Sequence, residues 1–279
     1  MSCIRLYFTV FPLLLFVASI ASGQSAAPTP QTATQQQELA ANPARPTIST
    51  PATLTPVGYL QFESGLLSAW HSPEFSSQSS FNEVAKIAVT QRVQFLAATE
   101  PFARSRVGGT SANGTGDTDL GVQAVIHQGE GPRPTVAVSY FGRVYAGDAP
   151  DVDIGSYRNS LILLFSADVK GFHYDTNYLF NEMVQGSVRR AQFAQTLSVS
   201  HPLAREFTLS GEIWHFTQPF LRSNAVGNLW ALSYAARPNL VLDTGFDRGL
   251  TYTSTHWEFV AGFTYLLPHR LWPAKRNSR

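Results

Sequence analysis

The stretch that decides the fold is Arg158–Asn181, which reads RNSLILLFSADVKGFHYDTNYLFN. In its second half, apolar and polar side chains occupy alternate positions, and only Leu179 breaks the polar face. The apolar face consists of Phe172, Tyr174, Thr176, Tyr178 and Phe180. A period of two residues indicates a β-strand with one apolar and one polar face.

The first half of this stretch, Asn159–Val169, predicts a second strand. Lys170-Gly171 predicts the tight turn between the two strands, because Gly tolerates a positive φ. Strands of about ten residues exceed the five or six that are usual in soluble sheets, and they match a tilted strand that crosses a bilayer. The hairpin alone leaves a soluble β-sandwich as the alternative.

The rest of the chain, from Val57 to Leu267, continues as a train of alternating segments. We expect strands at 57–66, 81–89, 91–98, 117–127, 134–145, 159–169, 171–181, 190–200, 205–216, 227–236, 240–247 and 255–267. Their connections alternate between long and short, and an even strand count with short turns at one end is typical of outer-membrane barrels. The sequence therefore predicts an all-β fold, a transmembrane antiparallel up-and-down β-barrel of about 12 strands, in which no strand edge is left unpaired.

Composition and the N-terminus agree with that fold. Charged residues make up 14% of the chain and aromatic residues 12%, against about a quarter charged in an average protein. The formal net charge of +1 gives no reason to expect a nucleic-acid partner. Met1–Gly23 has a basic start, an apolar run at Phe8–Ile20 and a small-residue cleavage site, which indicates a secretory signal peptide.

These features predict a protein of the Gram-negative outer membrane, with outer-membrane lipid and the barrel-assembly machinery as partners. We divide the chain into a signal peptide at 1–23, a disordered spacer at 24–56, a barrel at 57–267 and a basic tail at 268–279. The spacer is rich in Pro, Thr, Gln and Ala and has no hydrophobic period, which is typical of disorder.

A short motif, Gly116-Asp117-Thr118-Asp119-Leu120-Gly121, opens the strand at 117–127. With the strands around it, the chain resembles the outer-membrane transporter family of the meta-pathway of phenol degradation, in which Gly-Asp-Thr-x-Leu-Gly opens a strand after a loop. The resemblance covers about 55–267. It implies passage of small organic molecules, including aromatic ones. The chain departs from such barrels at its end, where 268–279 follow in place of a terminal aromatic residue.

Charged residues on the face opposite the apolar stripe are the candidates for the lumen wall, because a charge facing lipid costs a few kcal/mol near the midplane. They are Glu63, Lys86, Arg92, Asp119, Arg143, Asp175, Glu212, Asp243 and Glu258. They predict either a polar channel or a packed ion-pair network that fills a narrow barrel. Asp243, Glu258 and Glu63 fall on consecutive strands of a closed barrel, and an acidic stripe there would favour cations.

We expect no metal site, since the seven histidines have no paired spacing. We expect no catalytic residue, because no nucleophile elbow or orienting third group is evident, and no cofactor. The most favoured function is a channel or transporter for a small-molecule solute, not an enzyme. A binding or structural barrel with a closed lumen is the second possibility. The third is a hydrolase at the rim, with His215 and Ser233 or His256 and Glu258 as partners. The tryptophans are expected in interfacial girdles; they are Trp70, Trp214, Trp230, Trp257 and Trp272.

Overall fold

The computed structural model describes residues 39–150, 152 and 155–272. The expected signal peptide and the end of the basic tail lie outside the described residues. Among the residues described, no helix is long and apolar enough to cross a membrane. The described strands are β1 Leu60–Trp70, β2 Ser77–Ala88, β3 Val93–Val107, β4 Thr110–Gly114, β5 Thr118–His127, β6 Thr135–Tyr145, β7 Tyr157–Val169, β8 Phe172–Gln185, β9 Val188–Pro202, β10 Phe207–Gln218, β11 Ser223–Arg237, β12 Leu240–Gly249 and β13 Trp257–Leu266.

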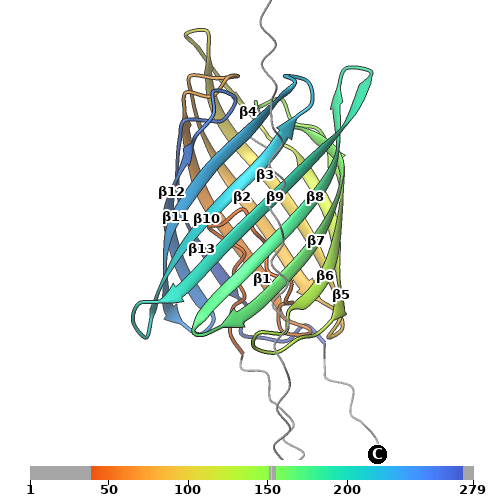
Figure 1. The fold of residues 1–279 in the computed structure, drawn as a ribbon, viewed down its shortest axis with the longest axis vertical. Helices are drawn as coiled ribbons and strands as arrows, with labels where there is room; N and C mark the ends of the chain where they lie inside the picture. Colours follow the sequence, from red (N-terminus) through yellow and green to blue (C-terminus); the bar gives the residue numbers. More distant parts are fainter. Residues whose placement is uncertain (1–38, 151, 153–154, 273–279) are drawn as a thin grey trace, which may run out of the picture. The chain divides into compact units, whose positions relative to one another are not determined.

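The strands form one closed antiparallel barrel (Figure 1). Apart from β4, neighbours in sequence are neighbours in the sheet, and β1 closes the ring by pairing with β13, with Ser64 opposite Phe263. β4 pairs only with β3, in a hairpin that extends one end of the barrel, so the other described strands make a twelve-stranded ring. The expected all-β, twelve-stranded transmembrane barrel is confirmed, with β4 as an extra strand.

The connections differ from the expectation at one end of the barrel. The Lys170-Gly171 turn is present, with φ of 52° and 83°. The long loop expected at 182–189 is wrong, because β8 and β9 stay paired as far as Gln185 and Val188. The strands continue beyond the apolar band as polar hairpins, so the outer connections are shorter than the hydrophobic pattern alone suggests.

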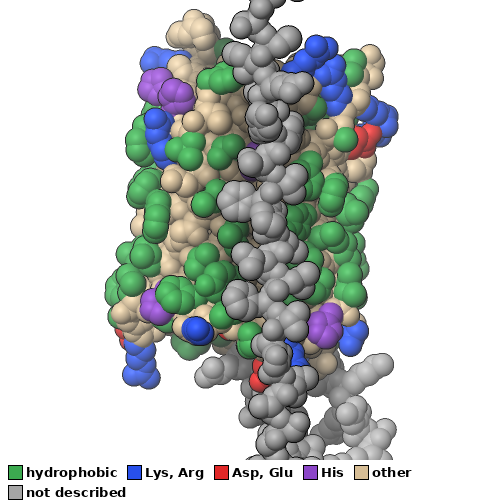
Figure 2. Space-filling view, viewed as in Figure 1, with side chains coloured by type: hydrophobic (Ala, Val, Ile, Leu, Met, Phe, Trp, Pro, Cys, Tyr) green, Lys and Arg blue, Asp and Glu red, His purple; other side chains and the backbone are tan. Residues whose placement is uncertain are grey.

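The two faces of the strands follow the alternation. On β8, Asp175, Asn177, Leu179 and Asn181 are buried, whereas Phe172 and Phe180 are exposed. Figure 2 shows hydrophobic side chains over the outer surface, with Lys, Arg and His side chains gathered toward the two ends. The apolar face of each strand therefore forms the outside of the barrel, and the polar face forms the lumen wall.

Tyr178→Arg should reduce the amount of assembled barrel. Tyr178 lies mid-strand on the outer face of β8, where its ring packs edge-on against Phe165, and an arginine there would cost roughly 2–4 kcal/mol at the membrane midplane. The measurement is the yield of folded protein in the membrane fraction. Tyr178→Phe keeps an apolar ring at the same position and should assemble normally. Equal yields for the two variants would contradict this assignment of the faces.

Candidate functional site

Residues 39–56, which we call the lumen segment, correct the expectation of a disordered spacer over this part of 24–56. The segment is bonded to the inner faces of the strands and lies within the barrel (Figure 1). Asn42 and Gln61 on β1 exchange two hydrogen bonds, from Asn42 N to Gln61 Oε1 and from Gln61 Nε2 to Asn42 O, both 2.8 Å. The sequence lacks a hydrophobic period because polar wall side chains, not apolar packing, satisfy the backbone of the segment.

Glu212 on β10 makes the most concentrated contact with the lumen segment. Its carboxylate accepts hydrogen bonds from Ile48 N at 2.7 Å, from Ser49 N at 2.7 Å and from Ser49 Oγ at 2.5 Å. Ser49 Oγ is also 2.7 Å from Thr196 Oγ1 on β9. Glu212 and Thr196 are buried, and Ser49 has no exposed surface, so these bonds are shielded from water and are stronger than surface bonds.

Further wall strands bind the segment in the same way. Asn177 on β8 accepts from Thr50 N at 2.6 Å and donates to Thr50 O at 2.9 Å. The remaining contacts are Ala52 N to Ser166 Oγ on β7, Gln123 Nε2 on β5 to Pro51 O, and Thr55 N to Gln94 Oε1 on β3. The segment is thus bonded to strands on every side of the ring.

The expected acidic stripe does not stand free in the lumen. β12, β13 and β1 are neighbours as expected, but Glu63 and Asp243 each take part in an ion pair. Glu63 contacts Lys86 Nζ at 2.5 Å and accepts from Ala44 N at 3.1 Å. Asp243 is paired with Arg45 at 3.4 Å. The charges of Glu63 and Asp243 are therefore balanced by Lys86 and by Arg45 of the lumen segment.

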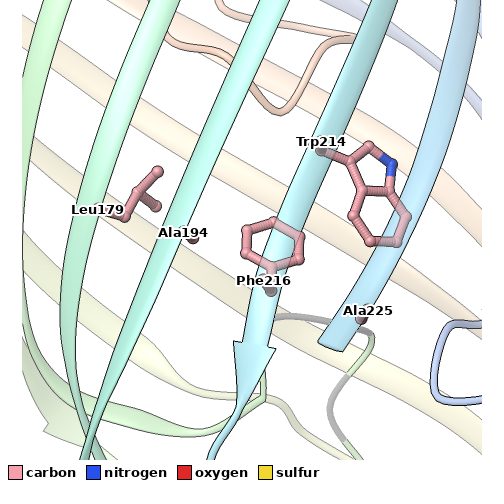
Figure 3. Close-up of a cluster of buried hydrophobic side chains, with 5 residues drawn as sticks. All are labelled: Leu179, Ala194, Trp214, Phe216 and Ala225. Atoms are coloured by element: carbon pink, nitrogen blue, oxygen red, sulfur yellow. The ribbon is translucent and has the colours of Figure 1, made fainter. Parts of the chain in front are cut away.

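An apolar cluster lies on the lumen wall beside the segment (Figure 3). Its buried members are Leu179, Ala194, Trp214, Phe216 and Ala225, and Ile48 of the segment packs against them. This cluster explains why Leu179 interrupts the polar face of β8. Trp214 is fully buried, and its Nε1 donates to Asp247 Oδ2 at 2.5 Å, so its expected place in an interfacial girdle is wrong. Trp70, Trp230 and Trp257 are exposed.

Next to the segment lies a cavity of about 470 Å³, lined by Thr47 and Ile48 of the segment and by strands on several sides of the ring. No Lys or Arg is among its described lining residues, whereas the acidic ones are Glu83, Glu100, Asp117, Asp119 and Glu258. Glu83 is exposed and accepts a hydrogen bond from Ser64. Asp117 is paired with Arg143 at 2.9 Å.

The other candidate residues are placed as follows. Asp175 is buried and accepts from Ser166 Oγ at 2.5 Å, with His173 Nε2 at 3.2 Å. Arg143 also contacts Ser156 near the cavity. The expectation that Arg92 lines the lumen is wrong. Arg92 is exposed in the turn between β2 and β3, because β3 begins only at Val93.

The functional residues that the sequence pattern missed are those whose contacts join segments far apart in the sequence. Arg45 lies in a segment without periodicity, and its partner Asp243 is far away in sequence. Asn177 falls on the polar face of β8, which was the only signal for it. Asp247 lies four residues beyond Asp243 on the same face of β12 and is buried, so alternation could have found it.

The pair proposed for a rim hydrolase is separated. In the register of β10 and β11, His215 is opposite Val226, and Ser233 is opposite Thr208, near the other end of the strands. His215 alternates with buried Trp214 and Phe216, so it faces outward. The geometry therefore contradicts a Ser–His pair at these two positions.

No family model matches the chain, and no curated protein matches it. Its structure is similar to an outer membrane channel from Pseudomonas putida F1, with a TM-score of 0.57 and 12% identity over 77% of this chain and 98% of that one. It is similar to the NanC porin, with a TM-score of 0.52 and 13% identity over 75% and 100%. For the KdgM porin the values are 0.50 and 10% over 74% and 98%. The shared feature is the barrel fold.

Proposed function

We propose that the protein is a channel for small molecules in the bacterial outer membrane, and that the lumen segment is its internal plug. The closed barrel with an apolar outer face supports a place in outer-membrane lipid, reached through the signal peptide and the barrel-assembly machinery. The polar inner wall supports a solute route. The fold shared with outer-membrane channels and porins agrees with this function.

The observation that carries the proposal is the way in which the plug is held. Its described contacts with the wall are mainly hydrogen bonds between its backbone and the side chains of Glu212, Asn177 and Gln61, with one ion pair between Arg45 and Asp243. Water can replace each of these bonds, and the apolar anchors of the segment are limited to Ile48, Ala52 and Leu54, which pack in two small clusters on the wall. Such a segment can open locally while the paired strands of the barrel remain intact.

The test is solute passage through the native protein. Purified protein in liposomes should give slow swelling with small sugars, amino acids and phenolics, and planar bilayers should show brief, small openings. In line with the resemblance given above, we propose that small organic molecules, including aromatic ones, are the solutes, so phenolics should enter faster than sugars of similar size. Equal rates for all solutes of one size would contradict selectivity for organic solutes.

A closed-lumen binding or structural barrel is the second candidate, because the plug is bonded to the wall on every side. The two candidates differ in one measurement. A channel conducts at least when the plug is loosened, whereas a structural barrel stays silent in planar bilayers both with the native plug and with a loosened one.

A further inference from the structure

The motif at the start of β5 builds the wall of the cavity. Asp117 accepts from Arg143 Nη1 and from Gly147 N, each at 2.9 Å, which fixes the loop above the strand. Gly116 has no side chain, and a Cβ there would overlap the carboxylate of Glu100. The motif therefore brings two lining carboxylates, Glu100 and Asp119, to the same cavity.

Asp119 has a carboxylate oxygen without a partner. The residue is 8% exposed, and Tyr157 OH donates to its Oδ2 at 3.2 Å. Its Oδ1 is buried and has no hydrogen-bond partner among the described residues. A buried acceptor of this kind costs free energy unless a donor reaches it. Because Asp119 lines the cavity, a donor inside the cavity is the group that would satisfy it.

The rest of the lining defines which donor fits. Glu100 and Glu258 add carboxylates, and no Lys or Arg is present among the described lining residues. Tyr157 and Phe216 contribute aromatic rings, and Leu67 and Val84 contribute aliphatic surface. Carboxylates next to aromatic rings suit a cation that carries an apolar body, since rings attract cations at their faces. A volume of about 470 Å³ lies in the range of small-molecule sites.

We infer that this cavity binds an organic cation, an amine with a small aromatic or aliphatic body, with its ammonium group at Asp119. An inorganic cation fits less well, because the described residues contain no group of three His, Cys, Asp or Glu side chains that could hold a metal ion. This inference deepens the proposed function by naming a class of solute, but the binding itself does not require passage through the barrel.

The test is equilibrium binding to the detergent-solubilised full chain by titration calorimetry, with phenethylammonium as the probe. Phenethyl alcohol and phenylacetate are the neutral and anionic controls of the same shape. Phenethylammonium should bind with one site per chain, about tenfold or more tightly than the alcohol, and phenylacetate should not bind. Asp119→Asn keeps an acceptor for Tyr157 and should weaken binding of the ammonium about tenfold.

Glu100→Gln, which changes a second lining carboxylate, should also weaken binding. Glu130→Gln is the matched control, because Glu130 is exposed in the turn between β5 and β6 at the other end of β5. Equal affinity for ammonium and alcohol, native affinity in Asp119→Asn, or displacement of the amine by micromolar Ca²⁺ would each overturn the inference. Binding without any solute passage would keep the cation site and reject the channel, and passage without binding would do the reverse.

Discussion

Glu212→Ala should convert a barrel with rare openings into one that conducts most of the time. The substitution removes the acceptor of three hydrogen bonds from Ile48 and Ser49 and leaves two backbone N–H groups of the plug without a partner. Water in an opened lumen can solvate those groups, so the free energy that holds the plug falls by about 3 kcal/mol. The equilibrium between bound and released plug should shift about a hundredfold.

The measurement is open probability in planar bilayers, together with hydrogen exchange at the amides of Ile48 and Ser49, which should become faster. Ser210→Ala is the matched control. Ser210 lies on the same inner face of β10, two positions from Glu212, but it is bonded to Ser200 Oγ at 2.8 Å rather than to the plug. Faster exchange in Glu212→Ala without added conductance would favour the closed-lumen barrel, because the plug would then move without opening a route.

The barrel could be predicted because its information is local. Alternation along 171–181 assigns each side chain of β8 to lipid or lumen, and a strand slipped by one residue would reverse all of them. The register seen between β7 and β8, with Leu163 opposite Tyr178, puts two apolar side chains on the outer face. Every strand of the barrel has one face in contact with lipid, so a period of two residues along each strand is enough to predict the fold.

The plug could not be predicted because its information is distributed around the ring. Its bonded backbone groups are matched by polar side chains from several strands of the ring, such as Gln61, Asn177 and Gln94. Nothing in residues 39–56 distinguishes them from a disordered linker when they are taken alone. For the same reason, the pattern of aromatic residues predicts a girdle position for Trp214, whereas its hydrogen-bond partner, Asp247, is buried on another strand.

The motif at the start of β5 contains one residue whose role could be predicted from the sequence and one whose role could not. Asp119 was assigned to the lumen from alternation, and the structure places it against the cavity. The role of Gly116 required the position of Glu100 on a neighbouring strand. Glu63 accepts a hydrogen bond from Ala44 N, and Asp243 is paired with Arg45. These two acids therefore bind the plug, and we expect solute selectivity at the cavity instead.

A disulfide between the plug and the wall should close the barrel reversibly. Ser49 Oγ and Thr196 Oγ1 are 2.7 Å apart, so sulfur atoms on the same Cβ positions in a Ser49→Cys/Thr196→Cys double variant would lie within reach of a bond of about 2.05 Å. Cys3 is the only cysteine of the chain, so a Cys3→Ser background leaves a single possible pair. The oxidised form should show no openings in planar bilayers.

The reduced form of the same variant should conduct more than the native protein, because it has lost the bond from Ser49 Oγ to Glu212. The same double variant should therefore conduct less than the native protein when oxidised and more when reduced. A simple defect in folding would not produce both changes. Each single-cysteine variant serves as a control and should not respond to oxidant. If mass spectrometry shows the disulfide and conductance still matches that of the reduced form, the solute does not pass where the plug lies. The route would then have to lie beside a fixed plug, and release of Glu212 would no longer be the step that opens the barrel.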